Sequence, residues 1–233
     1  LSSPLPSLPS TLFLARSSPS PAMCNLFLSL RPPTGRHSLI LLSNRDEVLA
    51  RPTAEADWRD GILAGIDLQI PLKGTWFCIN KQGKIGLLLA ITQLPEHRRP
   101  DAKSRGRIAP DFLLSPMEGK EYCDSLKSTA DEYDGFTFVA IDRPSGEYEM
   151  HSFTNAHVDE LETKEWPKAA HVVGNCPPHT TYKKMERGRE LLDEVLNGIV
   201  EETTSEEIAE SLFAMGQDRV QCYPDAQLDS QVS

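Results

Sequence analysis

The alternation of apolar and polar segments along the chain predicts a body of short strands and helices. Continuous apolar runs over residues 26–30 and 38–43 have the length of strands, and their lack of alternation indicates strands covered on both faces. Further strands are predicted where β-forming residues are bounded by turn residues; they cover residues 61–67, 74–80, 84–92, 136–142, 148–153 and 169–174.

Helical spacing of apolar residues appears in three later segments. Residues 117–133 are predicted to form a helix, and residues 182–199 a second one. Thr204 and Glu207 have the spacing of a capping box, which predicts the start of a last helix. The order of strands, helix, strands and two helices predicts an α+β domain with mainly antiparallel pairing.

The two ends of the chain differ from this body. Residues 1–22 contain seven Ser and five Pro but no acidic residue, so they cannot bury enough surface to offset their ordering entropy. We expect a disordered leader there, which is either translation upstream of Met23 or a targeting peptide. Residues 23–215 are expected to form the domain, and residues 216–233 a polar tail.

Charge and cysteine content narrow the class of protein. The chain has 24 Lys and Arg against 34 Asp and Glu, and a net charge of −10 disfavours nucleic-acid binding. No apolar run approaches the roughly 20 residues that cross a bilayer. Five scattered cysteines without a C-x-x-C pair exclude a disulfide scaffold or zinc ribbon and indicate a reducing compartment. The sequence therefore predicts a soluble, cytoplasmic protein.

Cys24 is the first candidate for chemistry. It follows Met23, and removal of an initiator methionine would make it N-terminal. The α-amino group of such a cysteine, with a pKa of about 7.7–8.0, can act as the base for its own thiol. The alternative is a buried cysteine that only begins a strand.

The second candidate is the polar tetrad Asn44, Arg45, Asp46 and Glu47, which directly follows a predicted buried strand. Ligand-contacting residues often occupy such a position, and an arginine near a thiol can hold it as a thiolate. The alternative is a solvated exit from the strand.

Two further groups suggest ligands. A basic cluster in the loop after residue 92 could attract a carboxylate or phosphate, such as a haem propionate or acyl-CoA, or could be a solvated loop; it comprises Arg98, Arg99, Lys103, Arg105 and Arg107. Cys176-Pro177 is like the Cys-Pro pair of some haem-responsive proteins, with His179 nearby. The other histidines lack metal-ligand spacing, so no metal site is predicted.

Several of these residues, together with other short motifs, resemble the NRDE family. The motifs run in order from Met23 to about Met215; they are Met-Cys at 23–24, the tetrad with Arg-Pro at 51–52, Gly65-x-Asp67, Gly-Thr-Trp at 74–76, Ser-Arg-Gly-Arg at 104–107, Tyr-Asp-Gly-Phe at 133–136 and Gly-Asn at 174–175. This family is similar to the N-terminal-nucleophile hydrolases, so the resemblance implies a four-layer αββα sandwich of antiparallel sheets.

The resemblance also implies a set of catalytic residues. Cys24 would be the nucleophile, Arg45 and Asp46 would orient it, and Asn175 would donate to an oxyanion. The family's Thr-Asn pair falls here at Leu89-Ala90, with Thr92-Gln93 the nearest polar substitute. Its late Gly-Thr-Arg is absent, which implies that the last strands are missing and leaves enzymatic activity uncertain, with a non-enzymatic role favoured.

Members of the family are linked to Golgi organisation, mitochondria, lipid homeostasis and haem mobilisation. The first hypothesis is therefore a protein that takes up haem or a lipid-like or acyl-CoA-like ligand as cargo, needs no cofactor, and contacts membranes peripherally, with mitochondrial or Golgi association. Candidate ligand-binding residues are Asn44, Arg45, Asp46, Glu47, Arg105 and Arg107. The alternatives are an amidohydrolase that cleaves a C–N bond with Cys24, and a scaffold in the secretory pathway without a ligand.

Overall fold

The computed structural model describes residues 24–34, 36–47, 49–91, 93, 98–222 and 225. The predicted leader, Met23 and Thr92 lie outside the described residues. Among the described residues, no helix has both the length and the apolar composition needed to cross a membrane.

A three-stranded antiparallel sheet, called the small sheet below, has β1 (Asn25–Ser29) at its centre. It pairs with β10 (Ala170–Gly174) on one side and β2 (Ile40–Asn44) on the other. All five residues of β1 are buried, which confirms the strand covered on both faces that its continuous apolar run predicted.

A seven-stranded antiparallel sheet, called the large sheet, follows the order of the chain. Its strands are β3 (Thr53–Arg59), β4 (Ile62–Asp67), β5 (Phe77–Asn80), β6 (Ile85–Ala90), β7 (Phe136–Asp142), β8 (Glu149–Thr154) and β9 (Thr163–Trp166). Sequence patterning missed β3 and β9. Both are edge strands, β3 mostly exposed and β9 exposed at Lys164 and Glu165, so ladder pairing rather than a continuous apolar pattern defines them.

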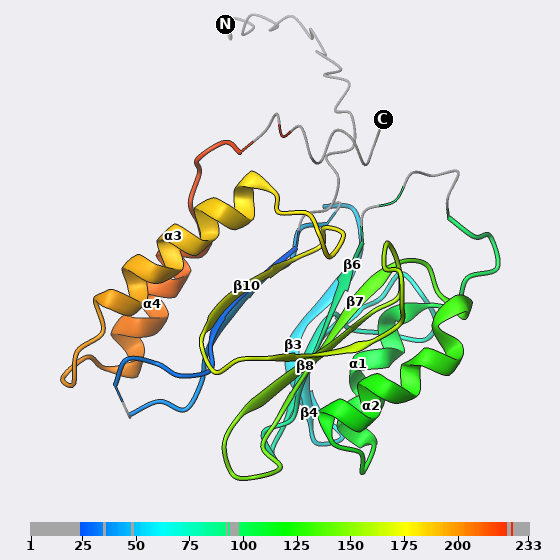
Figure 1. Ribbon diagram of the computed structural model, residues 1–233, viewed down its shortest axis with the longest axis horizontal. Helices are drawn as coiled ribbons and strands as arrows, with labels where there is room; N and C mark the ends of the chain where they lie inside the picture. The colour runs from blue at the N-terminus through cyan, green and yellow to red at the C-terminus, as the bar shows by residue number, and fades with distance from the viewer. Residues whose placement is uncertain are drawn as a thin grey trace, which may run out of the picture.

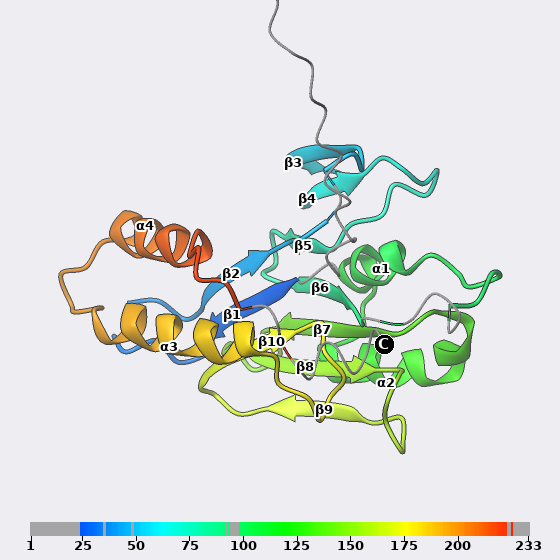
Figure 2. The same ribbon diagram turned by 90° about the horizontal axis from the view of Figure 1, so that it is seen from above.

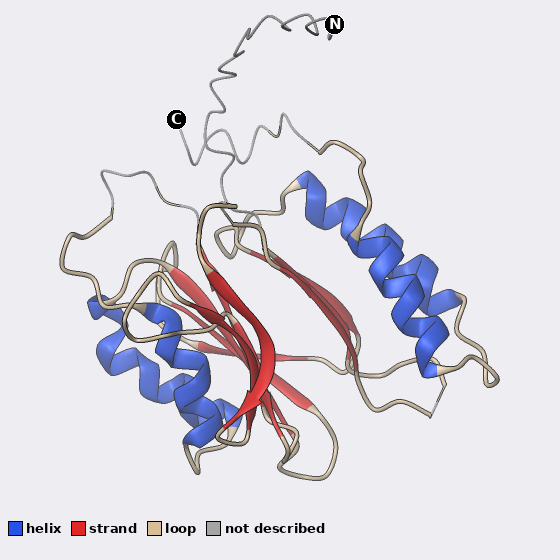
Figure 3. Cartoon of the chain, turned by 180° about the vertical axis from the view of Figure 1, so that it is seen from behind, coloured by secondary structure: helices blue, strands red, loops and turns tan. Residues whose placement is uncertain are grey.

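Four helices cover the outer faces of the two sheets (Figures 1 and 3). They are α1 (Ile108–Leu114), α2 (Gly119–Ser125), α3 (Lys183–Asn197) and α4 (Ser205–Gly216). The chain therefore forms four layers, with α3 and α4 on the small sheet and α1 and α2 on the large sheet. Figure 2 shows β3 and β4 at one end of the large sheet and β9 at the other.

Three apolar clusters join these layers. Leu28 on β1 and Val139 on β7 belong to the core between the sheets. Phe27, on the opposite face of β1, packs with Leu192 of α3 and other side chains of the two outer helices. A third cluster, which includes Phe112 of α1, joins α1 and α2 to the large sheet. Successive side chains of β1 therefore point alternately into the core between the sheets and toward the outer helices, which explains why its sequence is apolar at successive positions.

The helix predicted over residues 117–133 is only partly correct. The α-helical part ends at Ser125, and η3 (Leu126–Glu132) continues as a 3₁₀ helix. The hydroxyls of Ser125 and Ser128 each donate to the carbonyl three residues before them, and these local bonds compete with regular helix geometry. The preceding α1 was not predicted because it is short and has Pro110 in its first turn.

The predicted capping box is confirmed at α4. The Glu207 backbone N–H donates to Thr204 Oγ1 at 3.2 Å, and the Thr204 N–H donates to Glu207 Oε2 at 2.8 Å. After α4, residues 217–222 and 225 form no regular element, but Asp225 is buried and its Oδ2 accepts from the Lys183 N–H at 2.6 Å. This contact ties the last described residue to the start of α3.

Candidate functional site

Cys24, Arg45 and Asn175 lie at the same end of the small sheet. Asn25 pairs with Asn44 of β2 on one side and with Gly174 of β10 on the other. Cys24 precedes Asn25, Arg45 follows Asn44 and Asn175 follows Gly174, so all three residues lie at this end of the sheet. The Cys24 side chain packs against the core between the two sheets, and Arg45 extends to the Trp76 ring, 4.1 Å from its centroid. The structure therefore brings together three of the four predicted catalytic residues by strand pairing.

The Cys24 thiol is half-buried at this strand end. Its Sγ donates to the backbone carbonyl of Asp46 at 3.7 Å, which makes Asp46 the fourth member of the group. Burial raises the pKa of the Cys24 thiol, although the hydrogen bond to Asp46 and the positive charge of Lys184 act to lower it. The thiol is therefore protonated at neutral pH, as expected for a desolvated cysteine.

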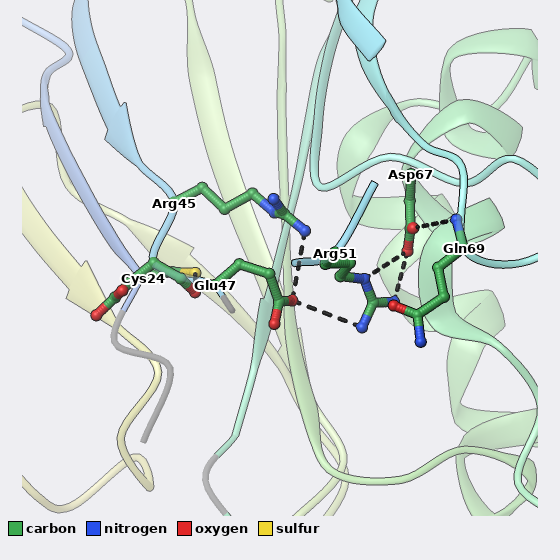
Figure 4. A network of polar contacts seen from close by, with 7 residues as sticks. Cys24, Arg45, Glu47, Arg51, Asp67 and Gln69 are labelled. Atoms are coloured by element: carbon green, nitrogen blue, oxygen red, sulfur yellow. Dashed lines mark hydrogen bonds and ion pairs between the residues drawn. The ribbon is translucent and has the colours of Figure 1, made fainter. Parts of the chain in front are cut away.

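Arg45 and Glu47 belong to a chain of charged contacts that crosses from the small sheet to the large one (Figure 4). Arg45 Nη2 donates to Glu47 Oε2 at 3.3 Å, and Arg51 Nη1 lies 3.6 Å from the same oxygen. Arg51 continues to Asp67 on β4, at 2.5 Å. Because Arg45 and Arg51 both contact carboxylates, this network holds the segment of the polar tetrad, residues 44–47, in place.

Asp67 closes the network at the large sheet. Partial burial acts to raise the pKa of its carboxyl, but hydrogen bonds from Arg51 and from the Gln69 N–H outweigh burial, so the pKa lies below its usual value. The Arg-Pro at 51–52 and Gly65-x-Asp67 motifs therefore meet in space, at the contact that positions the tetrad.

The other predicted ligand-binding residues are engaged elsewhere. Asn44 Nδ2 donates to the Gly216 carbonyl at the end of α4, at 3.1 Å. Arg105, in the short 3₁₀ helix η2 (Arg105–Arg107), donates to the Gly135 carbonyl at 2.6 Å, and burial lowers its pKa. Arg107 pairs with Asp111 one turn into α1, at 2.5 Å. These contacts join neighbouring elements rather than converge on Cys24.

Lys184, in the first turn of α3, is the residue of this group that sequence reasoning missed. Its Nζ donates to Asn175 Oδ1 at 2.9 Å, and the Asn175 side chain is almost completely buried. Burial lowers the pKa of Lys184 to about 8, against opposing contributions from Cys24 and Asp46. Lys184 stands beside the exposed Lys183 in a charged helix start, so no pattern in the sequence distinguishes it.

A cavity of about 800 Å³ lies between β10 and the β7–β9 part of the large sheet. Residues 172–174 of β10 and residues 176–181 of the following loop form one wall, and Ser152, Thr163 and Trp166 belong to the other. Cys24, Arg45 and Asn175 do not line it, although Gly174 and Cys176 on either side of Asn175 do. Sequence reasoning did not find this cavity, because its walls belong to two different sheets whose packing the sequence pattern does not reveal.

Cys176 and His179 both line this cavity. The Cys176 thiol donates to the Thr180 carbonyl at 3.0 Å, lies 3.3 Å from Met185 Sδ, and has a pKa raised by burial. Within the described part of the chain, no three His, Cys, Asp or Glu side chains are grouped as metal ligands. The arrangement offers a half-open cavity to a small molecule and, separately, gathers a thiol, an arginine and an amide at one end of the small sheet.

Two antiparallel sheets between helical layers, with a Cys–Arg–Asn–Lys group at one end of the small sheet, define a layered α+β protein with a candidate reactive site. Residues 23–233 match the family model described as Transport and Golgi organisation 2, and the chain belongs to this family. The resemblance to the NRDE family is thereby confirmed.

Relatives in three animals agree with this assignment. The chain is 30% identical to the mouse Transport and Golgi organization 2 homolog over 181 residues, which are 75% of this chain and 64% of the mouse protein. It is 28% identical to the Drosophila melanogaster Transport and Golgi organization protein 2 over 218 residues, 88% of this chain and 76% of the relative. A bovine homolog is 27% identical over 216 residues, 90% of this chain and 77% of the relative.

Proposed function

We propose that this protein takes up haem or a lipid-like ligand such as an acyl-CoA and passes it between membranes and compartments. The observation that carries the proposal is the cavity of about 800 Å³ beside β10. Its size lies in the range of cavities that hold cofactors and other small molecules, roughly 300–1,000 Å³. The names of the relatives, which refer to transport and Golgi organisation, support a role in membrane traffic.

The lining of the cavity suits a ligand with an apolar body and a polar group. Trp166, Val158 and Pro177 supply apolar surface, and hydroxyl side chains such as Ser152 lie among them. Ser152 Oγ already accepts from Trp166 Nε1 at 2.9 Å, which fixes the indole in the wall. A flat or extended apolar ligand would contact the indole and bury surface on both sheets.

Charge gives the ligand an orientation. Asp159, Glu160 and Glu162 line one part of the cavity and are exposed, so their charges are screened by solvent. Lys164 supplies an ammonium, with Nζ 3.6 Å from the centroid of the Trp166 ring. A propionate or phosphate group of the ligand would therefore bind on the Lys164 side.

The proposal relies on the shape of the cavity rather than on iron ligation by Cys176. That thiol is buried, protonated and bonded to the Thr180 carbonyl, and an iron–thiolate bond would require this hydrogen bond to break. Haem is accordingly proposed as cargo and not as a resident cofactor.

The test is titration of haem and of palmitoyl-CoA into the purified chain and two variants. Val158→Trp places an indole in the cavity and should weaken binding at least about tenfold, a loss of about 1.4 kcal/mol. Val200→Trp, an equal change at a residue that is 55% exposed between α3 and α4, should leave binding unchanged. No Soret shift with haem together with no palmitoyl-CoA binding would refute the proposal.

We also propose, as a second candidate, an amidohydrolase that uses Cys24. The supporting observation is that Cys24, Arg45 and Asn175 meet at one strand end, in the layered arrangement that resembles N-terminal-nucleophile hydrolases. In that mechanism the α-amine of Cys24 is the base, so the cysteine must be the first residue. Intact mass spectrometry of the native protein tests this requirement, and a mature start upstream of Cys24 would rule it out.

A further inference from the structure

Two sulfur atoms meet in the wall of the cavity beside β10. Cys176 Sγ lies 3.3 Å from Met185 Sδ, and both residues line the cavity. Cys176 comes shortly after β10, whereas Met185 belongs to the first turn of α3. The fold therefore joins a thiol and a thioether from two elements at one point of the cavity surface.

Packing holds both sulfur atoms in place. A Cβ atom at Gly174 would lie 2.5 Å from Met185 Sδ, so the glycine leaves the space that the thioether occupies. The Met185 N–H donates to the Tyr182 carbonyl at 2.8 Å, which fixes the backbone at the start of α3. Cys176 Sγ in turn donates to the Thr180 carbonyl at 3.0 Å. The pair is thus positioned before any ligand binds.

A turn after Cys176 brings an imidazole to the same cavity. The Thr180 N–H donates to the Pro177 carbonyl at 3.0 Å and closes a turn with Pro178 at its second position, where proline is favoured. The third position is His179, which is exposed and lines the cavity with the two sulfur atoms. Thiol, thioether and imidazole are therefore all available from the cavity side.

We propose that Cys176, His179 and Met185 bind a soft monovalent metal ion, copper(I). Thiolate and thioether ligands select Cu(I), and imidazole also suits copper. On binding, the S–H bond of Cys176 breaks, a Cu–S bond forms, and the proton passes to solvent without a change in oxidation state. The thiol loses its hydrogen bond to the Thr180 carbonyl, a small cost because S–H is a weak donor.

The spacing of the sulfur atoms suits one shared ion. With metal–sulfur bonds of about 2.3 Å, the length that zinc forms with thiolates, an ion can contact both sulfur atoms at their separation of 3.3 Å. The unbranched methionine side chain can adjust further around the ion. The half-open cavity supplies the entry path that a metal site needs.

Charge and ligand number favour Cu(I) over divalent ions. Lys184 acts electrostatically on Cys176; a Cu(I)–thiolate pair is neutral, whereas a divalent ion would keep a positive charge beside this ammonium. Zinc prefers a complete tetrahedral shell, and in the described segments no third His, Cys, Asp or Glu joins Cys176 and His179. Histidine spacing predicted no metal site because the third donor is a methionine on another element.

This inference goes beyond the proposed function and does not depend on it. Haem or an acyl-CoA would bind along Trp166 and Lys164, whereas the metal ion needs only the side of the cavity after β10. Failure of haem and palmitoyl-CoA to bind would leave the metal site intact. Loss of the metal site would equally leave the proposed function standing.

The test is titration of the chain with Cu(I) against the chelator bicinchoninate. All proteins carry Cys24→Ser and Cys222→Ser, because these half-buried thiols would bind copper themselves. Met185→Leu removes the thioether at nearly equal volume and should weaken binding at least about tenfold. Met215→Leu, the same change at a buried methionine of α4, should leave the affinity unchanged. Equal affinities with and without Met185→Leu would overturn the inference.

A second measurement locates the ion in the native chain and covers a failure of Met185→Leu to fold. Methionine-methyl NMR with Ag(I), a soft ion of the same charge, should shift the Met185 signal, which its contacts with the Tyr182 ring identify. The signal of Met150, buried between the sheets, should not move. Cys176→Ser should abolish the shift, since the thiolate charge is lost. A Met185 signal that Ag(I) leaves unchanged would equally refute the metal site.

Discussion

Arg51 donates two hydrogen bonds, from Nε and Nη2, to one carboxylate oxygen of Asp67, at 3.1 and 2.5 Å. The other side of the Arg51 guanidinium faces Glu47, which also accepts from Arg45. Arg51 therefore connects the segment after β2 to the end of β4 and fixes the polar tetrad beside Cys24.

Replacement of Arg51 by methionine should lower the free energy of unfolding by about 1–3 kcal/mol, because the buried Asp67 carboxylate loses a charged donor. Urea denaturation at pH 7 measures the change. Arg59→Met is the matched control: Arg59 lies 3.8 Å from Asp57 in an exposed pair, so we expect a loss below about 0.5 kcal/mol. Equal losses in the two variants would contradict a specific role for Arg51.

The stabilisation by Arg51 should depend on pH. The folded-state pKa of Asp67 lies below its usual value, so its contribution to stability is complete above the unfolded-state pKa of about 3.9 and is lost as the pH falls through the folded-state pKa. The stability difference between the native chain and Arg51→Met should therefore be constant near neutrality and shrink below about pH 4. A difference that persists in strong acid would indicate that Arg51 acts by packing instead.

Gly74→Ala should destabilise the fold through a backbone clash. A Cβ atom at position 74 would lie 2.5 Å from Gly106 Cα, in the contact that joins η2 to the segment before β5. We expect a loss of about 1–3 kcal/mol, measured as a lower melting temperature by circular dichroism. Gly198→Ala is the control, since its Cβ would be no closer than 3.4 Å to any atom and should change stability little.

Asp225→Ala should loosen the start of α3. Tyr182 makes no side-chain cap there, and Asp225 Oδ2 accepts from the Lys183 N–H at 2.6 Å instead. Loss of this contact should cost about 1 kcal/mol and speed amide exchange in the first turn of α3, which hydrogen-exchange mass spectrometry detects. Asp218→Ala, which removes an ion pair with Arg187, should not change exchange in that turn.

The buried strands could be predicted from the sequence because their apolar residues report burial directly. β1 and β7 are buried at every position; the first appeared as a continuous apolar run and the second as a run of β-forming residues before a turn. The edge strands β3 and β9 could not be found in this way, since pairing with one neighbour holds them and many of their side chains are exposed. The 3₁₀ continuation after Ser125 depends on hydroxyl bonds that periodicity does not reveal.

The candidate site likewise combines residues that sequence motifs could identify with contacts that only tertiary packing creates. Its motifs singled out Cys24, Arg45 and Asn175, but the pairing of β1 with β2 and β10 is what brings them to one strand end. Lys184 has an ordinary charged setting in the sequence, and only the packing of α3 beside the end of β10 buries its amine against Asn175.

The sequence by itself determined the α+β class, most of the strands, the two longer helices α3 and α4 and the family, because these depend on local periodicity and short motifs. The tertiary structure decided which polar groups meet and where a ligand could fit. The physical reason is that Cys24 and Asn175 lie more than a hundred residues apart in the sequence and that the walls of the cavity belong to two different sheets, so these arrangements exist only after the layers have packed.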